Sequence, residues 1–461
     1  MTGAGDPGQA RAVVVGGGLA GVTAALRLAD AGLAVTLVEG RPRLGGLAFS
    51  FTRGDLTVDN GQHVYLRCCT AYRWFLDRVE GTALAPLQDR LDVPVLDVAG
   101  DRPRLGRIRR NALPVPLHLA AGLARYPHLS LAERASVGRA ALALRNLDLE
   151  DPALDEVDFA TWLHRHGQSP RTVEALWDLV GVATLNATAE QSSLALAAKV
   201  FTTGLLTEPG AADIGWARVP LGELHDTLAA KALAAAGVRT ELRTRVSDIS
   251  RRPEGGWRVA LDGESVEAET VVLAVAQREA HALLPDGALA DPGRLLAIGT
   301  APILNVHVVY DRKVLRRPFF AALGSPVQWV FDRTGTSGLT DGQYLALSQS
   351  AAQDDIELPV ARLRERYLPE LERLLPAARG AGVRDFFVTR ERTATFAPAP
   401  GVGRLRPAAR TDAPGLFLAG SWTATGWPAT MEGAVRSGLN AAGAALTELG
   451  RPHGHPLGEA A

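Results

Sequence analysis

The chain has 461 residues, of which 47% are apolar and 21% charged, and its formal net charge is −1. This composition indicates a globular protein with a large core, and a charge near zero excludes bulk electrostatic attraction to nucleic acid. At about 150 residues per domain the length suggests about three domains, but α/β enzymes often interleave such a length into two, and we expect two.

The two cysteines, Cys68 and Cys69, are neighbours, and a disulfide between them would close a strained ring. Reduced thiols fit a cytoplasmic protein. Residues 1–10 lack the charged and apolar segments of a signal peptide, so we expect flexible termini there and at residues 451–461. Since no uncharged apolar run reaches the ~18 residues of a membrane-spanning helix, any membrane contact would be peripheral.

The first predicted elements are a strand, a glycine loop and a helix. Residues 12–15 are apolar, and helical apolar spacing then continues as far as Gly32. Three glycines form G-x-G-x-x-G, which allows a tight turn, close approach of a pyrophosphate and close packing of helix on strand. The helix N-terminus would face the phosphates. The predicted contacts are Gly16, Gly18, Leu19, Ala20 and Gly21.

A second apolar run, residues 35–38, ends at Glu39. Glu39 follows Gly16 by roughly the 20 residues expected for a carboxylate that binds an adenosine ribose. Its charge disfavours a 2′-phosphate, and hence NADP, but does not distinguish NAD from FAD. On the glycines alone, a tight βα turn without a ligand stays open.

Gly45 and Gly46 come next, where the chain would run along the diphosphate and the ribityl group. This glycine pattern resembles the glutathione-reductase-like FAD superfamily, in its amine oxidase and carotenoid desaturase branch. The resemblance implies FAD contacts from Glu39, Arg41, Gly45 and Gly46. Leu47, the next contact, departs from the pattern, because relatives often have Arg there.

Two longer motifs make the resemblance more specific. The segment DNGQHVYL contains Gly61, which permits close approach, and the hydrogen-bonding side chains of Gln62 and His63. The second motif is GLFLAGSWTATGWPATMEGAVRSG, residues 415–438. Together they resemble the squalene-associated desaturases, the hydroxysqualene dehydroxylases of hopanoid pathways, over nearly the whole chain.

In that motif, residues 415–420 predict a buried strand whose last residue, Gly420, lets the ribityl chain approach the backbone. Ser421 follows where the superfamily usually has Asp, and losing a charged acceptor could cost FAD binding ~1–2 kcal/mol. A helix over residues 430–446 would point its positive end at the flavin and stabilise the anionic reduced form by ~0.3–2 kcal/mol. Its start supplies the contacts Thr430, Met431 and Ala434. Without a cysteine nearby, we expect non-covalent FAD.

The middle of the chain alternates between two patterns. A strand leads toward Val246, whose backbone meets the adenine in the superfamily, and a hairpin at Asp262-Gly263 precedes a buried strand at residues 270–276. Residues 113–206 have helical spacing broken near Pro127 and Pro170. Residues 302–347 are strand-like, and helical spacing then continues through Leu375.

We therefore predict an α/β protein in which a glutathione-reductase-like FAD-binding Rossmann domain is interleaved with an α+β substrate domain of mixed sheet and helical cap. The FAD-binding domain comprises residues 11–100, 210–295 and 400–450, and the substrate domain residues 101–209 and 296–399. Substrate would lie between the two.

A basic segment precedes the first cap helix and carries Arg102, Arg104, Arg107, Arg109 and Arg110. A solvated hairpin explains these charges as well as a function does. Alternatively, residues 102–123 dock peripherally on anionic lipid at the inner face of the membrane and admit an isoprenoid.

The resemblance implies that the enzyme removes the hydroxyl group of hydroxysqualene reductively, giving squalene and water. Once its oxygen is protonated, the allylic C–O bond can ionise, so the site must be dry, contain an acid and tolerate a cation. The polar groups nearest the expected ring are His63 and Glu432, and Trp427 could stabilise the cation by ~0.5–2 kcal/mol. For Glu432 the alternative is a helix pair with Arg436, and for Trp427 it is core packing.

Three other functions stay open. Desaturation of a related isoprenoid would run hydride in the opposite direction. Amine oxidation commonly needs a lysine beside the ring, and none of Lys199, Lys231 and Lys313 lies in a motif expected there. A prenyl-binding escort protein would share the fold without using flavin. The sequence predicts no metal site and leaves the oligomeric state open.

Overall fold

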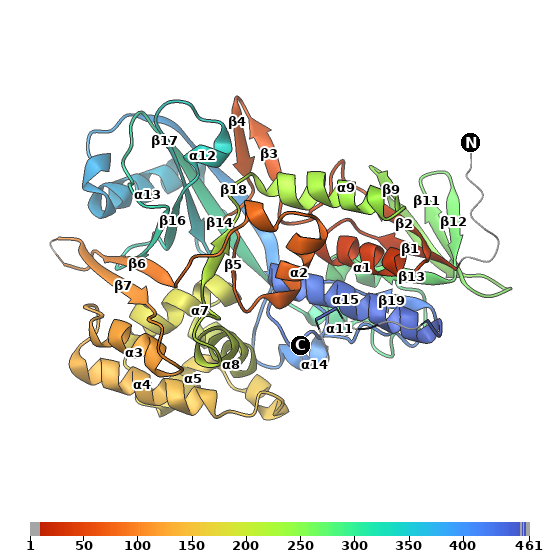
Figure 1. Ribbon diagram of the computed structural model, residues 1–461, viewed down its shortest axis with the longest axis horizontal. Coiled ribbons are helices and arrows are strands. Elements are labelled where there is room, and N and C mark those ends of the chain that lie inside the picture. Colours follow the sequence, from red (N-terminus) through yellow and green to blue (C-terminus); the bar gives the residue numbers. More distant parts are fainter. Residues whose placement is uncertain (1–9, 101, 452–453, 455, 458–461) are drawn as a thin grey trace.

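The computed structural model describes residues 10–100, 102–451, 454 and 456–457. The termini that we expected to be flexible lie almost wholly outside these residues. Figure 1 shows three regions: a sheet with long helices at one end, a second sheet, and a group of helices that cover the space below the second sheet.

Five parallel strands form the central sheet of the cofactor domain, in the order β19-β13-β1-β2-β9. In register, Val14 of β1 lies opposite Leu37 of β2 and opposite Val272 of β13. Separate stretches of chain supply the strands, so the predicted interleaved α/β fold is confirmed. The bounds are β1 Arg11–Val15, β2 Ala34–Glu39, β9 Arg239–Leu242, β13 Thr270–Leu273 and β19 Leu416–Leu418.

The side chains of β1 alternate between two cores, as expected of a strand covered on both faces. Ala12 and Val14 pack into the cluster formed by the helices, whereas Val13 and Val15 pack with the strands of a three-stranded antiparallel sheet. The helices are α1 Leu19–Asp30, α9 Leu228–Ala235 and α15 Met431–Glu448. The antiparallel sheet consists of β10 Val246–Arg251, β11 Trp257–Leu261 and β12 Ser265–Ala268, with the predicted hairpin turn at Gly263.

A seven-stranded sheet forms the base of the substrate domain, in the order β18-β14-β17-β16-β15-β6-β7. Every pairing is antiparallel except that of β15 with β6. One face is covered by α13 Val360–Leu374, which buries Leu363, Tyr367 and Leu371 at four-residue spacing. The strands are β6 Asp92–Asp97, β7 Arg104–Arg109, β14 Thr300–Tyr310, β15 Phe319–Leu323, β16 Trp329–Asp332, β17 Gln343–Gln349 and β18 Val383–Phe396.

The predicted helical cap follows β7. Two of the breaks between its helices fall at the prolines that the sequence indicated, Pro127 and Pro170. Pro127 lies between the first two helices, and Ser130 then caps the second in a capping box with Glu133. Pro170 is the first residue of a short helix, where its missing N–H is tolerated. The cap comprises α3 Leu117–Ala124, α4 Leu131–Arg145, α5 Phe159–Arg165, α6 Pro170–Thr172, α7 Asp178–Leu185, α8 Leu194–Phe201, and the π turns η3 Val173–Trp177 and η5 Thr202–Leu206.

Short elements join these parts. The strands and helices are β3 Ser50–Arg53, β4 Leu56–Asp59, β5 Val64–Leu66, β8 Ile214–Trp216, α2 Thr70–Arg78, α10 Gln277–Leu283, α11 Arg294–Ala297, α12 Thr334–Ser337 and α14 Val402–Leu405. The remaining 3₁₀ and π turns are η1 Thr82–Leu84, η2 Pro152–Glu156, η4 Ala189–Gln191, η6 Glu223–Thr227 and η7 Pro376–Ala378.

The structure differs from the sequence reading at two places. The strand predicted toward Val246 is two strands in different sheets, because the chain turns at Arg243, whose φ is +58°. β6 falls within residues 11–100, which we assigned to the cofactor domain, but pairs with β15 in the substrate sheet. Cys68 and Cys69 are both free. None of the helices in the described part of the chain is both long and apolar enough to cross a membrane.

Candidate functional site

The loop between β1 and α1 is shaped by its glycines. Gly16 has a φ of +108°, and a Cβ at Gly21 would overlap the carbonyl oxygen of Gly16. Gly18 is the N-cap of α1, and no described side chain caps this helix. Its first N–H groups are therefore available to an anion, so the loop fits a diphosphate.

Glu39 at the end of β2 is held beside this loop. Its carboxylate accepts the backbone N–H of Gly17 at 2.6 Å and that of Arg41 at 2.7 Å. Each oxygen keeps a further lone pair for a ribose hydroxyl. The N–H of Thr244, two residues before Val246, donates to the Glu39 carbonyl at 3.1 Å. Val246 thus begins β10 close to the place where Glu39 would hold an adenosine.

The second glycine pair lies directly against the first loop. Gly45 donates its N–H to the carbonyl of Gly17 at 2.9 Å, and a Cβ at Gly46 would come within 3.0 Å of the Gly18 Cα. The guanidinium of Arg43, which the sequence reading did not single out, donates to the Gly46 carbonyl at 3.0 Å. The side chain of Leu47 is exposed. The two glycine segments therefore form one narrow cradle that a Cβ would fill.

Asn60 connects this cradle to the substrate sheet. Its amide donates to the carbonyl of Leu47 at 2.8 Å and to Glu391 at 2.9 Å. Its own carbonyl accepts the Asn305 amide at 3.0 Å and the Thr389 hydroxyl at 2.7 Å. Asn305 lies on β14, and Thr389 and Glu391 lie on β18; nothing near these three in the sequence marked them as part of the site.

Two buried polar atoms near Asn60 have no partner in the described protein, Gln62 Nε2 in the segment that follows it and Asn305 Oδ1 on β14. Buried amide atoms rarely stay unpaired, so they are a place where a polar ligand fits. Gln62 and His63 also line a cavity of about 10 Å³, enough for about one water molecule. Burial lowers the pKa of His63, and its Nδ1 lies 3.2 Å from the carbonyl of Gly61.

The C-terminal motif is held in shape from behind. Gly420 has a φ of +141° and donates its N–H to Ser437 at 2.8 Å. Arg406 is buried, and its guanidinium donates to the carbonyls of Ser421 and Trp427 at 3.2 and 2.9 Å. Burial lowers the pKa of Arg406 to about 10. The loop that carries Ser421 is therefore closed around a cation that the sequence reading missed.

The opening loop and the closing helix meet, as the predicted cofactor site requires. α1 and α15 lie side by side (Figure 1), and a Cβ at Gly438 would overlap the carbonyl of Ala20. α15 begins at Met431, and the hydroxyl of Thr430 accepts the N–H of Gly433 at 3.1 Å. Both ends of one extended coenzyme can therefore be bound in a single region.

Glu432 is buried, but its carboxylate faces α2. It accepts the N–H groups of Ala71 at 3.1 Å and Tyr72 at 2.8 Å, and it pairs with Arg436 at 2.7 Å. Burial raises its pKa, and Arg436 is the largest opposing influence. Since both oxygens cap α2, we do not carry Glu432 forward as the proton donor. The predicted pair with Arg436 is confirmed.

Trp427 is buried between two cations. The Nζ atom of Lys199 lies 5.5 Å from its ring centroid, and the guanidinium carbon of Arg436 lies 5.0 Å from it. Spacing along the chain does not predict Lys199 here, because α8 lies more than 200 residues from the motif. Burial, and then the neighbouring Arg436, lower the pKa of Lys199.

Two neighbouring aromatic residues of β15, Phe319 and Phe320, point to opposite faces of the substrate sheet. Phe319 packs edge-on against Trp216 at 5.4 Å and lies 6.3 Å from Trp329. Its neighbour Phe320 points to the opposite face, into the core beneath α13. Phe319, together with Trp216 and Trp329, therefore lies on the face of the sheet opposite to α13.

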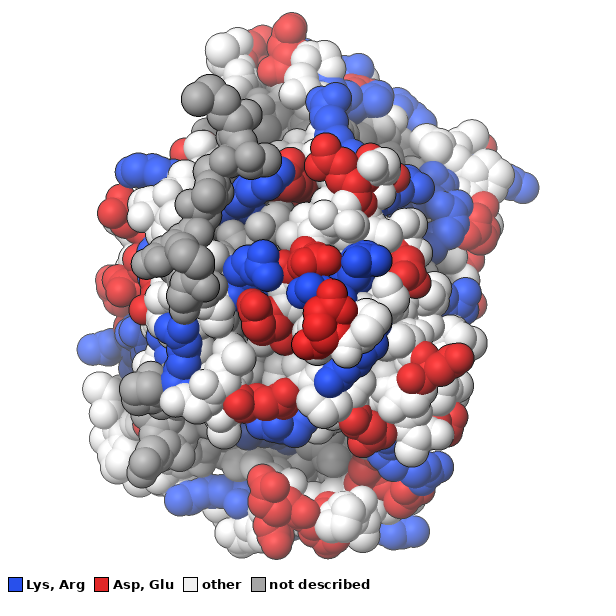
Figure 2. All heavy atoms as spheres, turned by 90° about the vertical axis from the view of Figure 1, so that its right-hand side faces the viewer, with Lys and Arg blue, Asp and Glu red and all other residues white. Residues whose placement is uncertain are grey.

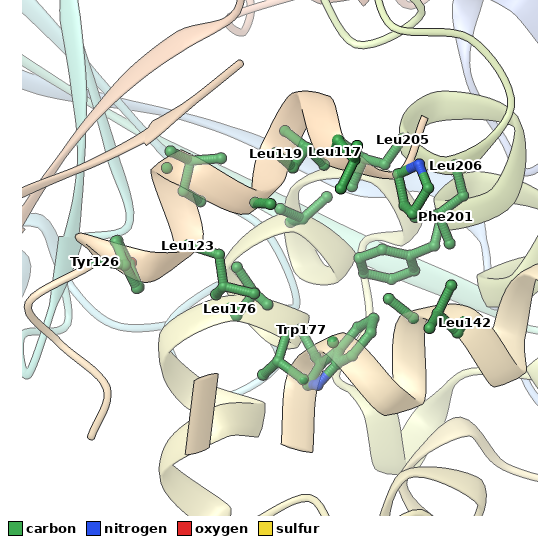
Figure 3. Close-up of a pocket in the computed structure, with 18 of the residues that line it drawn as sticks. Leu117, Leu119, Leu123, Tyr126, Leu142, Leu176, Trp177, Phe201, Leu205 and Leu206 are labelled. Atoms are coloured by element: carbon green, nitrogen blue, oxygen red, sulfur yellow. The ribbon is translucent and has the colours of Figure 1, made fainter. Parts of the chain in front are cut away.

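The cap encloses an apolar cavity of about 380 Å³, within the range typical of small-molecule sites. Its wall comes mainly from α3, α4, η3 and η5, and Figure 3 shows the leucine and aromatic side chains converging on it. The labelled residues are Leu117, Leu119, Leu123, Tyr126, Leu142, Leu176, Trp177, Phe201, Leu205 and Leu206. No acidic residue is among the described residues that line it.

Comparison with known proteins places these features in context. A family model for flavin containing amine oxidoreductases matches residues 19–446. The hydroxysqualene dehydroxylase of Sinorhizobium fredii is 28% identical over 94% of this chain and 98% of its own length. The zeta-carotene desaturase of a Synechocystis species is 24% identical over 96% of this chain and 98% of its own. Cyclohexylamine oxidase from Brevibacterium oxydans has a similar structure, with a TM-score of 0.72, 20% identity and coverage of 96% of this chain and all of that one.

Proposed function

The chain belongs to the family of flavin-containing amine oxidoreductases, and we propose that it is an FAD-dependent enzyme that reductively dehydroxylates hydroxysqualene to squalene. The predicted resemblance to the hydroxysqualene dehydroxylases is confirmed by 28% identity over 94% of the chain. The observation that supports this substrate best is the apolar cavity of about 380 Å³ in the cap, which suits a hydrocarbon chain and has no carboxylate among its described lining residues.

FAD would be held without a covalent bond. The N-terminus of α1 would bind the diphosphate, Glu39 the ribose, and the backbone at Gly420 and Ser421 the ribityl chain. The Gln62 amide, which has no protein partner in the described structure, is available to the polar edge of the ring. When bound and reduced, FAD supplies the hydride for the reaction.

The protein itself must keep the site dry and deliver one proton. Overall, the substrate carbon gains a hydride, its C–O bond breaks, and the hydroxyl group leaves with a proton as water. We propose His63 as the proton donor. Because its Nδ1–H is directed at the Gly61 carbonyl, its Nε2 carries a proton only in the imidazolium form. Its lowered pKa makes that form a stronger acid than a free imidazolium, and the protonated fraction rises as the pH falls.

The test is a single turnover without oxygen. Purified, FAD-loaded protein is reduced with dithionite and mixed with hydroxysqualene, and the extract is analysed by gas chromatography. We expect one squalene per reduced FAD, at a rate that rises as the pH falls from 8 to 6. His63→Gln should lower the rate at pH 6 at least tenfold and remove the pH dependence. A protein that binds FAD but forms no squalene would refute the proposal.

Desaturation of an isoprenoid is the second candidate, favoured by the similarity to the zeta-carotene desaturase over 96% of the chain. The same protein with oxidised FAD is incubated with squalene, phytoene and zeta-carotene. A product with an additional double bond, together with no dehydroxylation, would replace the first proposal with this one.

We further propose that residues 102–123 contact a membrane surface from which the substrate enters. β7 contributes the exposed Arg107 and Arg109, and Leu113 and Leu117 are about half exposed nearby. A variant in which Arg107 and Arg109 are replaced by glutamate should sediment less with anionic liposomes than the parent protein does.

A further inference from the structure

A second cavity, of about 420 Å³, lies beside the apolar cavity and is lined by arginines. The walls of the two cavities share Arg107, Arg109 and Gly122. Gly122 lies where α3 touches β7, because a Cβ there would overlap the carbonyl of Arg109. A hydrocarbon compartment and a basic compartment therefore adjoin along the same strand and helix. The arginines of the second cavity are Arg90, Arg107, Arg109, Arg110 and Arg125.

Local carboxylates leave much of this positive charge unbalanced. Arg110 is fixed by the buried Asp213 at 2.6 Å. Arg107 and Arg109 share one carboxylate, Asp92, at 3.4 and 3.8 Å. Neither Arg90 nor Arg125 forms a salt bridge or a side-chain hydrogen bond with any described residue. Five guanidinium groups thus face two carboxylates, neither of which lines the cavity, so an anion would be attracted into it.

Another part of the surface has a different charge pattern. Figure 2 shows the end of the molecule that carries the small antiparallel sheet, where Lys and Arg alternate with Asp and Glu. Arg252 and Arg258 there both pair with Glu267. At that end of the molecule the arginines therefore have nearby carboxylates, unlike Arg90 and Arg125 of the second cavity.

The apolar cavity opens next to the basic one. Leu117 of α3 and Leu142 of α4 line it, yet are 53% and 47% exposed, so they stand at its mouth. Large exposed leucines beside a cavity are a typical entry point for an apolar chain. A molecule with a hydrocarbon tail could enter between these leucines while its head group stays at the arginines.

We propose that the two cavities together bind one amphiphile in place of the substrate, with its phosphate or diphosphate head on Arg90 and Arg125 and its hydrocarbon tail in the apolar cavity. Guanidinium groups pair with phosphate oxygens in a planar, two-bond geometry, which makes arginine the preferred residue for such a head group. A membrane phospholipid and an isoprenoid diphosphate both meet this description. The proposal rests on the proposed function only for the isoprenoid character of the tail.

The first test measures binding to the full-length, FAD-loaded protein by titration calorimetry. Farnesyl diphosphate and inorganic diphosphate serve as probes. We expect farnesyl diphosphate to bind at least tenfold more tightly than inorganic diphosphate, because only it fills both cavities. R90A/R125A should weaken its binding at least tenfold, and Leu123→Asp should remove the advantage of the tail. The matched control, R278A/K313A, removes two exposed cations elsewhere and should stay within twofold of the parent protein.

The second test identifies the source of the head group by sedimentation with vesicles of phosphatidylglycerol or phosphatidylcholine. Loss of phosphatidylglycerol binding in R90A/R125A, but not in the control, assigns the site to a membrane lipid. Binding of farnesyl diphosphate alone assigns it to a soluble isoprenoid diphosphate. If neither probe distinguishes R90A/R125A from R278A/K313A, the site does not exist. Squalene formation by the parent protein in detergent is measured separately, so failure here is distinct from failure of the proposed reaction.

Discussion

His225 makes the second glycine segment sensitive to acid. Its ring is fully buried on η6, with Nδ1 at 3.0 Å from the carbonyl of Ala48 and Nε2 at 2.8 Å from the hydroxyl of Tyr72. The carbonyl can only accept, so Nδ1 carries the hydrogen and Nε2 accepts from Tyr72. A Cβ at Gly45 would lie 3.1 Å from the His225 Cβ. A second proton would therefore disturb the segment next to the proposed FAD site.

Burial lowers the pKa of His225 to about 4, with a small opposing effect of the Ala48 carbonyl. In the unfolded chain the pKa lies near 6.5. Between these values the unfolded chain binds a proton that the folded protein does not, so the free energy of unfolding falls as the pH falls. The difference, at ~1.36 kcal/mol per pH unit, corresponds to about 3 kcal/mol. This contribution is complete above pH 6.5 and is lost by about pH 4.

The assay is urea unfolding of the parent protein and of His225→Gln at pH 7.5 and pH 4.5. Glutamine can still donate to Ala48 and accept from Tyr72, but it does not titrate. We expect the parent protein to lose about 2.5 kcal/mol more than the variant over this range, because pH 4.5 is still slightly above the folded pKa. Other buried histidines, such as His307, are present in both proteins and cancel. His164→Gln, at an exposed position, should behave like the parent protein. Equal losses in all three proteins would refute the reasoning.

Three further predictions follow from contacts described above. Glu432→Gln should lower the free energy of unfolding by about 3 kcal/mol, because Arg436 loses its buried partner. Flavin absorbance and turnover per folded molecule should stay within twofold of the parent protein. A tenfold loss of turnover with full flavin content would restore Glu432 as a catalytic acid. Gly21→Ala should abolish flavin binding, measured by absorbance near 450 nm, because its Cβ overlaps the Gly16 carbonyl, whereas Gly138→Ala, which meets no described atom within 4 Å, should retain it. Asp59→Asn and Arg333→Met, at an ion pair of 2.6 Å that is 5% and 8% exposed, should each cost about 3–5 kcal/mol in chemical unfolding, and the double variant should cost less than the sum.

The sequence predicted the parts of the candidate site that are continuous in the chain. Local spacing and side-chain chemistry identify them. They are the glycines at 16, 18 and 21 between β1 and α1, the acid at 39 at the end of β2, and the C-terminal motif that runs from β19 into α15. The helical cap could also be predicted, because its residues have helical spacing and Pro127 and Pro170 mark two of the breaks between its helices.

The rest depends on contacts between distant residues. Glu432 looks like one half of a helix pair, and only the fold places Ala71 and Tyr72 against it. Asn305 lies on a buried strand without a motif, and only the fold shows that its amide donates to the Asn60 carbonyl. Arg406 follows no motif, yet its burial inside the C-terminal loop fixes four carbonyl groups. Spacing along the chain cannot predict such partners, because three-dimensional packing selects them.

The strand order of the cofactor sheet also has a consequence for synthesis. β1 is the central strand and leaves the ribosome early, but β13 appears after about 260 further residues and β19 and α15 after about 400. Synthesis proceeds at ~5–20 residues per second. For tens of seconds β1 therefore lacks its neighbour β13, and α1 lacks the helix α15 that packs against it. We therefore expect nascent chains to need protection by chaperones until α15 docks, and to acquire the coenzyme only afterwards.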